Sequence, residues 1–292
     1  MIACPSEIAK SFPKRPIDSN KYTVGTVTIV GGSSHYIHAP VLAGLGARVG
    51  GAGLIHLVVP DASKIAASNL IPEATFLKQT PVCVPPRSDV TAIGMGLGMT
   101  PTSELLVSRL LSGSNSRFVI DADALNVLAN WYAKRPTLPV FDGPRMILTP
   151  HAGEAARLLA VKTEDILADR KSAIKQIVER YNATVILKGP NTLVSSPNIS
   201  EIYECDAGNP YMALGGMGDL LSGIVAARWA YLSHQMPETP PERIAFDAAR
   251  SSVWLHATAS DSLIKAEEPI DPSVKNTAKA VSTIRVILER SR

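Results

Sequence analysis

The stretch VGTVTIVGG, residues 24–32, carries the pattern from which the fold is predicted. The β-branched residues at 24–30 indicate a buried strand, and the Gly-Gly pair after them indicates a turn. The small residues at 39–49 then predict a helix, with Pro40 in its first turn, where the missing N–H of proline costs nothing. Residues 24–49 therefore predict a strand, a glycine turn and a helix in direct succession.

The same alternation continues along the 292 residues of the chain. Further strands are expected at residues 54–59, 91–94, 118–120, 146–148, 184–187 and 192–195. Helices are expected at residues 103–112 and 124–133, from 154, and at 163–181, 219–230, 242–257 and 276–289. This alternation predicts an α/β fold with a mostly parallel central sheet and helices on both faces. We expect one domain over residues 1–292, with its ligands at the carboxyl ends of the strands.

The composition is that of a globular protein and excludes several classes of partner. Hydrophobic residues make up 46% of the chain, and a net charge of +3 is too small to indicate binding to nucleic acid or to a membrane surface. The apolar runs are far shorter than the roughly 20 residues of a membrane span, and the N-terminus lacks a signal-peptide pattern. Three scattered cysteines favour a reducing compartment. We therefore expect a cytoplasmic protein whose partners are small molecules.

The segment GGMGDLLSG, residues 215–223, is the strongest indication of chemistry. Its glycines expose backbone N–H groups, and the helix expected after them adds unpaired N–H donors, so that the segment is suited to hold a transferring phosphoryl group. An acid beside a phosphate needs another task, and Asp219 is well placed to act as general base toward a substrate hydroxyl. The alternative is an ordinary helix start with Asp219 as its N-cap. The first interpretation predicts an enzyme that uses a nucleoside phosphate donor.

Six segments in the same order resemble one known family. They are VTIVGGSSHYIHAPVLAGLGARVGGAGL (27–54), AIGMGLG (92–98), VIDADALNVLA (119–129), ILTPHAGEAARLL (147–159), VILKGPNTLV (185–194) and GNPYMALGGMGDLLSG (208–223). Together they resemble the ADP-dependent NAD(P)H-hydrate dehydratases of the ribokinase-like superfamily, and the resemblance covers most of the chain. It implies a ribokinase-like fold and a lyase that phosphorylates hydrated NADH or NADPH and then eliminates phosphate to restore the coenzyme.

The resemblance also implies roles for individual residues. Asp219 would be the catalytic base. The residues that would bind the nucleotide, ADP or ATP, are Lys188, Gly189, Pro190, Asn191, Thr192, Gly215, Gly216, Met217 and Gly218. The residues that would contact the hydrate are Ala39, Gly96, Gly98, His151 and Asp219. Mg²⁺ is expected because phosphoryl transfer needs its charge neutralised. A homo-oligomer, possibly a tetramer, is implied by the resemblance alone.

Several of these residues have a second interpretation that involves no ligand. Lys188 comes after a strand and could be a solvated lysine, and His151 could cap or pack against the helix after it. Asp121 could bind Mg²⁺ or cap a helix, and for Asp123 we expect capping. Glu154 could be a metal or water ligand, or simply an acid in the first turn of a helix, where the helix dipole favours it.

The chain departs from the family pattern at two positions near the expected site. His38 stands where the family usually has glycine, and Leu214 stands where it has a small hydroxyl residue. Two other functions stay open. One is a small-molecule kinase of the same superfamily, acting on a vitamin or sugar alcohol, which the segments at 119–129 and 147–159 oppose. The other is a nucleotide-binding protein without activity, which the presence of Asp219 opposes.

Overall fold

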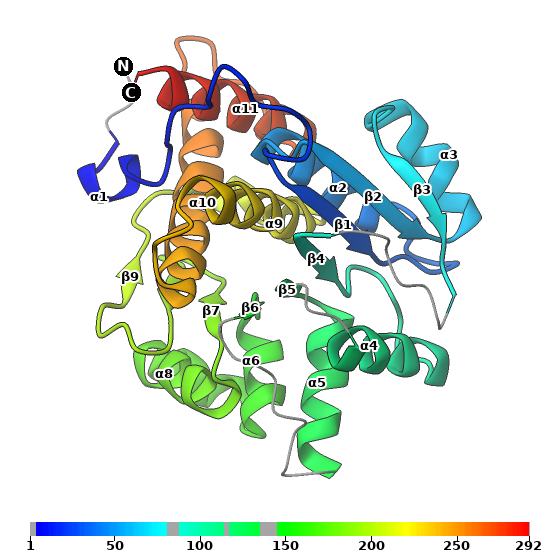
Figure 1. The fold of residues 1–292 in the computed structure, drawn as a ribbon. Coiled ribbons are helices and arrows are strands. Elements are labelled where there is room, and N and C mark those ends of the chain that lie inside the picture. Colours follow the sequence, from blue (N-terminus) through cyan, green and yellow to red (C-terminus); the bar gives the residue numbers. More distant parts are fainter. Residues whose placement is uncertain (1–3, 81–87, 114–116, 135–144, 292) are drawn as a thin grey trace.

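The computed structural model describes residues 4–80, 88–113, 117–134 and 145–291. Its centre is one nine-stranded sheet with the order β3-β2-β1-β4-β5-β6-β7-β8-β9 (Figure 1). The strands are β1 (Thr26–Val30), β2 (Leu54–Val59), β3 (Thr75–Lys78), β4 (Val90–Ile93), β5 (Arg117–Ile120), β6 (Met146–Leu148), β7 (Thr184–Leu187), β8 (Leu193–Ser195) and β9 (Tyr203–Glu204). Every pair from β3 to β7 is parallel, and β8 and β9 are added antiparallel. The predicted α/β fold with a mostly parallel sheet is confirmed.

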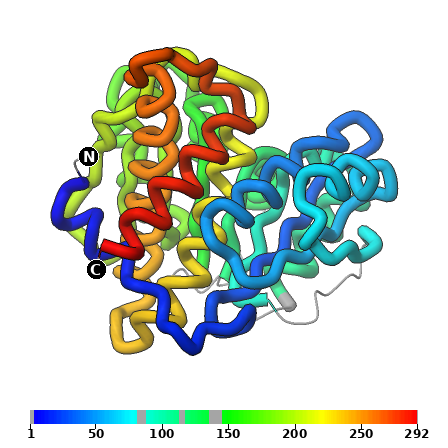
Figure 2. Tube along the Cα trace, turned by 90° about the horizontal axis from the view of Figure 1, so that it is seen from above, coloured from blue at the N-terminus to red at the C-terminus, as the bar shows by residue number. Residues whose placement is uncertain are grey.

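Helices cover both faces of the sheet, as predicted. They are α1 (Ser6–Ala9), α2 (Ala39–Gly50), α3 (Asp61–Leu70), α4 (Pro101–Gly113), α5 (Asp123–Lys134), α6 (Ala152–Leu159), α7 (Thr163–Ala168), α8 (Arg170–Tyr181), α9 (Met217–Gln235), α10 (Pro241–Ile264) and α11 (Val274–Arg290). The short 3-10 helix η2 (Pro210–Met212) precedes α9. Helices α2, α9 and α10 pack on one face, with α11 against α10 and α2, as Figure 2 shows from above. Helices α4, α5, α6 and α8 pack on the other.

The alternation of side chains along each strand divides the core into two clusters. In β5, for example, Val119 belongs to the cluster under α2, α9 and α10, whereas Phe118 and Ile120 belong to the cluster under α4, α5 and α6. Successive residues of a strand point to opposite faces, so a central strand needs apolar residues at every position. This is why the predicted strands read as short continuous apolar runs.

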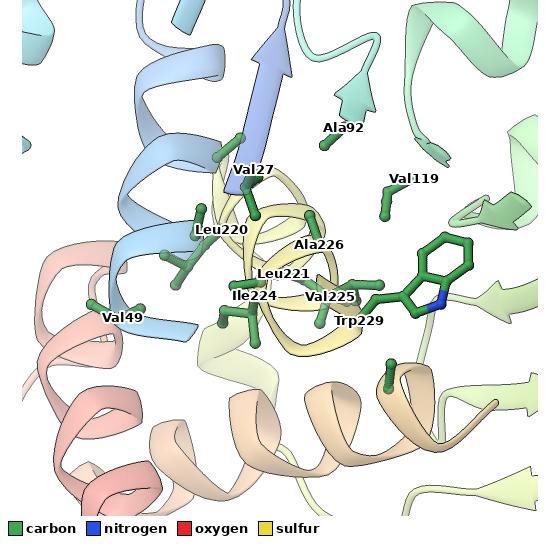
Figure 3. Packing of buried hydrophobic residues seen from close by; sticks show 14 of the residues in the cluster. Val27, Val49, Ala92, Val119, Leu220, Leu221, Ile224, Val225, Ala226 and Trp229 are labelled. Carbon is green, nitrogen blue, oxygen red and sulfur yellow. The ribbon is translucent and has the colours of Figure 1, made fainter. Parts of the chain in front are cut away.

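Helix α9 lies in the middle of the first cluster (Figure 3). Leu220, Ile224 and Ala226 are fully buried between the sheet and α2. The two helices approach so closely that a side chain on Gly223 would collide with the backbone of Ala43. Contact on nearly all sides fixes the start of α9 relative to the ends of the central strands.

The predicted helix at residues 163–181 is wrong in one respect, because the chain breaks it into α7 and α8. Asp169, with a φ of −144°, leaves the helical conformation and accepts a hydrogen bond from the Ser172 amide at 2.9 Å as the N-cap of α8. The sequence did not predict α3 and β3, and α9 begins two residues earlier than expected. Helix α10 begins at Pro241, one residue before the predicted start, and continues beyond the predicted end at 257 to Ile264.

Two further sequence expectations concern the whole chain. Cys205 is buried and unpaired, and burial raises the pKa of its thiol, which makes it less reactive; Cys83 lies outside the described residues. Among the described residues, no helix has both the length and the apolar character needed to cross a membrane.

Candidate active site

The glycine turn leads directly into α9. Gly216 is the N-cap residue and has a φ of 93°, a left-handed conformation that glycine adopts without a steric penalty. No side chain caps this end, so the alternative interpretation of Asp219 as N-cap is wrong, and Asp219 lies within the first turn. The Met217 amide donates to the Leu214 carbonyl at 3.3 Å, which leaves the Gly218 and Asp219 amides among the unpaired donors of the helix start. The turn therefore offers backbone donors to an anion.

Lys188 comes directly after β7, and its ammonium group lies beside this turn. Its Nζ is 2.8 Å from Oδ1 of Asp121 and 4.0 Å from Oε2 of Glu154, and a side chain on Gly218 would begin 3.4 Å from it. Only 20% of the Lys188 side chain is exposed, so the alternative of a solvated lysine is wrong. Burial alone would lower the pKa of Lys188, but Asp121, Glu154 and Asp219 together raise it. The ammonium charge is therefore retained next to the start of α9.

Asp121 comes directly after β5 and holds three elements together. Its carboxylate accepts hydrogen bonds from Lys188 Nζ at 2.8 Å, from Ser222 Oγ at 2.6 Å and from the Ala122 amide at 2.9 Å. Burial alone would raise the pKa of Asp121, but Lys188 and the hydrogen bonds lower it, so the buried carboxylate stays ionised. Ser222 lies three residues after Asp219 on α9, on the same side of the helix. Ser222 was not among the residues predicted from the sequence, although its spacing from Asp219 was a signal for it.

The same contacts decide how well Asp121 and Glu154 fit a metal. Both oxygens of Asp121 already accept hydrogen bonds within the protein, and Oε2 of Glu154 accepts one from the His151 amide at 2.8 Å. In the described part of the chain, no group of three or more His, Cys, Asp or Glu side chains is arranged to hold a metal ion. These residues therefore do not fit a Mg²⁺ site formed by the protein alone.

His151 and Glu154 form the start of α6. Nδ1 of His151 accepts a hydrogen bond from the Gly153 amide at 3.0 Å, and the carboxylate of Glu154 accepts one from the His151 amide, which completes a capping box. The capping interpretation of His151 is confirmed, and its predicted contact with substrate stays a prediction. Burial, and then the charge of Lys188, lower the pKa of His151. Burial has the opposite effect on the carboxyl group of Glu154: it raises the pKa, and the charge of Lys188 opposes that shift.

The loop after β4 holds Gly96 and Gly98, two of the residues predicted to contact substrate, and brings Gly96 close to a third, Ala39. Gly96 has a φ of 63°, and a side chain on it would begin 3.1 Å from the Cβ of Ala39 and 2.5 Å from that of Tyr36. The Gly98 amide donates to Oδ2 of Asp123 at 2.7 Å. Asp123 thus binds the neighbouring glycine loop, which is not the helix-capping role predicted for it. The structure places Gly96 against Ala39, with Gly98 two residues farther along the same loop, and their contact with a ligand stays a prediction.

The predicted nucleotide loop at residues 188–192 is the turn between β7 and β8. Gly189 has a φ of 147° and Asn191 a φ of 49°, so the chain reverses sharply on both sides of Pro190. Oγ1 of Thr192 donates to the Gly189 carbonyl at 2.9 Å, and Nδ2 of Asn191 donates to Oε1 of Glu204 at 3.3 Å. The loop begins at Lys188 and so adjoins the glycine turn of α9.

The Asp219 carboxylate lies among the charged side chains described above. Burial, together with the negative charges of Asp121, Asp123 and Glu154, raises its pKa to about 7, although Lys188 opposes the shift. A carboxylate with such a pKa can accept a proton near neutral pH, as a general base must. The site thus combines a carboxylate with a pKa near neutral, a fixed ammonium group and unpaired amides at one helix start.

The two departures from the family pattern lie near this site. His38 directly precedes α2 with its side chain exposed, and Leu214, also exposed, precedes the glycine turn. Neither side chain is buried in the core. Their effect on the choice of substrate stays a prediction.

Comparison with known proteins gives a consistent result. A family model described as NAD(P)H-hydrate dehydratase matches residues 27–281. The ADP-dependent (S)-NAD(P)H-hydrate dehydratase of Neisseria meningitidis serogroup B is 36% identical over 255 residues, which cover 86% of this chain and 81% of that protein. The bifunctional NAD(P)H-hydrate repair enzyme Nnr of Vibrio cholerae is also 36% identical, over 86% of this chain. The chain spans about half the length of that bifunctional relative, 47%.

The solved structures agree with the sequence comparison. The ADP/ATP-dependent NAD(P)H-hydrate dehydratase from Bacillus subtilis, co-crystallized with ATP/Mg2+, superposes with a TM-score of 0.82 at 25% identity and covers 96% of both chains. The fold is ribokinase-like, as predicted. On the family model and the relative at 36% identity, the chain belongs to the NAD(P)H-hydrate dehydratase family.

Proposed function

We propose that this chain is an ADP-dependent NAD(P)H-hydrate dehydratase, which uses ADP, or ATP in its place, to convert hydrated NADH or NADPH back to the normal coenzyme. The observation that carries the proposal is the position of Asp219. Its carboxylate, with a pKa of about 7, lies in the first turn of α9, within the field of the Lys188 ammonium group. The similarity of the chain to the NAD(P)H-hydrate dehydratases of Neisseria meningitidis and Bacillus subtilis supports the same reaction.

Asp219, Lys188 and Gly218 act at different points of the phosphoryl transfer. Asp219 accepts the proton of the ring hydroxyl while the hydroxyl oxygen attacks the terminal phosphorus of the nucleotide. The bond from that phosphorus to the bridging oxygen breaks, and with ADP as donor AMP leaves. Lys188 and the Gly218 amide stabilise the negative charge on the transferring group. The ring C–O bond of the phosphate ester then breaks, phosphate departs, and loss of a proton from the adjacent ring carbon restores the double bond.

The proposal assigns the remaining residues to two groups of contacts. The loop at 188–192 and the turn at 215–218 hold the nucleotide, and Ala39, Gly96, Gly98 and His151 contact the hydrate. Because the described residues do not form a metal site of their own, Mg²⁺ would arrive bound to the nucleotide phosphates. A cytoplasmic location, expected from the composition, and a homo-oligomer, implied by the resemblance, complete the proposal.

The decisive assay measures the absorbance of reduced nicotinamide. Purified protein is mixed with hydrated NADH, Mg²⁺ and either ADP or ATP, and the NADH absorbance band is recorded. We expect it to return in proportion to the AMP and phosphate released from ADP. No return with either nucleotide, together with phosphorylation of a hydroxylated vitamin or sugar alcohol, would establish the kinase alternative. Nucleotide binding without any turnover would establish the non-catalytic one.

The activity is expected to fall as the pH is lowered through about 7. Asp219 must be ionised to accept a proton, and its pKa is raised to about 7, so protonation removes the base below that value. kcat/KM should drop by about tenfold per pH unit on the acid side, measured from about pH 5.5 to about pH 8.5. A profile that stays flat down to about pH 5, where an ordinary carboxylate is still ionised, would contradict the assignment.

Gly218→Ala is expected to separate activity from stability. The new methyl group would lie 3.4 Å from Nζ of Lys188, an ordinary contact, and alanine favours a helix over glycine by up to about 1 kcal/mol. The free energy of unfolding in urea should therefore stay the same or rise. kcat/KM should nevertheless fall at least about tenfold, because the methyl group fills the space between the ammonium and the amides. Full activity in this variant would show that no phosphoryl group passes there.

A further inference from the structure

Arg170, the first residue of α8, donates hydrogen bonds to three backbone carbonyls, one at the end of β7 and two in the loop at residues 188–192. Its Nη2 donates to the Leu187 carbonyl at 3.0 Å, and its Nη1 donates to the carbonyls of Pro190 and Asn191, the latter at 3.3 Å. A planar guanidinium group can make several such bonds at once because its donors have a fixed fork geometry. One side chain from a separate helix thus holds both ends of the turn between β7 and β8.

We propose that Arg170 is a positioning residue for nucleotide binding, which sets the shape of the loop at 188–192 so that its backbone amides face the phosphates. The inference rests on the proposed function, which assigns this loop to the nucleotide. It adds a residue outside the site, on α8, that acts through the loop without touching the ligand.

The peptide geometry shows how the carbonyl bonds aim the amides. In a trans peptide the C=O of one residue and the N–H of the next point in opposite directions, and the described chain has no cis peptide. With the carbonyls of Pro190 and Asn191 turned toward Arg170, the N–H groups of Asn191 and Thr192 point away from it. Neither amide donates a hydrogen bond within the described part of the chain. Two adjacent free amides around a left-handed residue form the kind of concavity that binds anions.

The ordinary explanations for a surface arginine do not apply to Arg170. A cation in the first turn of a helix opposes the helix dipole, so Arg170 does not stabilise α8. It has no carboxylate within ion-pair distance in the described part of the chain, whereas the neighbouring Lys171 pairs with Glu204 at 2.8 Å. Burial also lowers the pKa of Arg170, although Glu204 opposes the shift, so the guanidinium is partly withdrawn from water at the loop.

Two features of the chain fit this role. The break at Asp169 ends α7 and starts α8 anew, so that Arg170 stands at a helix start beside the loop. Gly189 makes room for the guanidinium, since a side chain there would begin 3.2 Å from Nη2 of Arg170, and its φ of 147° also disfavours any side chain. The helix break and the glycine are thus accounted for by one contact.

The test is nucleotide affinity in matched variants of the full chain. The Kd for ADP is measured by titration calorimetry in the wild type, in Arg170→Gln and in Lys171→Gln, the adjacent basic residue that does not contact the loop carbonyls. We expect Arg170→Gln to bind ADP at least about tenfold more weakly and Lys171→Gln to stay within about twofold. KM for ADP should rise in Arg170→Gln, while KM for the hydrate stays within about twofold of wild type. In the ligand-free protein, hydrogen exchange at residues 187–192 should be faster in Arg170→Gln than in Lys171→Gln.

Each other outcome has a definite meaning. Unchanged ADP affinity in a folded Arg170→Gln variant would overturn the inference, as would a parallel rise of both KM values, which indicates a general structural loss. Should Arg170→Gln fail to fold, Arg170→Lys serves instead, because a compact ammonium group lacks the planar fork that reaches all three carbonyls in the wild type. The Arg170→Lys variant should bind ADP with intermediate affinity. A wild type that does not bind ADP would contradict the proposed function itself, which the wild-type titration detects independently of any variant.

Discussion

Asp219→Asn is expected to lower kcat by roughly 10²–10⁴-fold, the usual contribution of a general base. Asparagine has nearly the same shape and can occupy the first turn of α9, but its amide cannot accept the hydroxyl proton. The NADH absorbance assay with ADP gives the rate, and single-turnover measurements of AMP formation show whether phosphorylation is the step lost. Loss of NADH formation with AMP formation intact would instead place Asp219 in the elimination step.

The stability of the Asp219→Asn variant in urea shows whether its loss of activity comes from a folding defect. The folded-state pKa of Asp219 is raised to about 7, so folding disfavours its charged form, and this destabilises the fold increasingly as the pH rises from about 4 to 7. Asparagine removes that charge. Above pH 7 the variant should therefore unfold at the same or a higher urea concentration than the wild type. A less stable variant would mean that Asp219 has a structural role, and the loss of activity would then not identify it as the general base.

Lys188→Met is expected to harm both stability and activity. Asp121 is 1% exposed, and without Lys188 its buried carboxylate loses its cationic partner, which costs about 3–5 kcal/mol of unfolding free energy. kcat/KM should fall by roughly 10²–10³-fold, since the phosphoryl group also loses its fixed cation. Lys188 lowers the pKa of Asp219, so the acid limb of any residual activity should move to higher pH.

A second variant separates the two effects. Adding Asp121→Asn to Lys188→Met removes the unpaired buried charge, so the double variant should recover much of the stability measured in urea but none of the activity. Recovery of both would show that Lys188 acts only as a partner for Asp121. Recovery of neither would mean that the hydrogen bonds to Asp121 from Ser222 and from the Ala122 amide matter more for the fold than its ion pair with Lys188 does.

Local patterns were sufficient to predict most of the fold. The strands at 54–59, 146–148 and 184–187 were predicted at their observed limits, because buried parallel strands are continuous apolar runs between turn residues. The break at Asp169 was missed, because the amphipathic pattern continues across it and the capping hydrogen bond to Ser172 leaves little trace in the pattern.

The contacts between loops could not be predicted from local patterns. Ser222 bonds to Asp121 across 101 residues, and Lys188 meets Asp121 across 67. The sequence indicated residue types suited to phosphate chemistry, but it could not show that Lys188 lies against Gly218. Nor could it show that Asp123 bonds to the Gly98 amide, because both features depend on how the strands are ordered in the sheet.

The central claim is that the amides at the start of α9 and the ammonium group of Lys188 hold the phosphoryl group that Asp219 helps to transfer. A crystal structure of the protein with a non-hydrolysable ADP analogue tests it most directly. We expect the terminal phosphate within about 3 Å of both the Gly218 amide and Nζ of Lys188, with the Asp219 carboxylate facing it. A nucleotide bound elsewhere, with the start of α9 free of phosphate, would contradict the account.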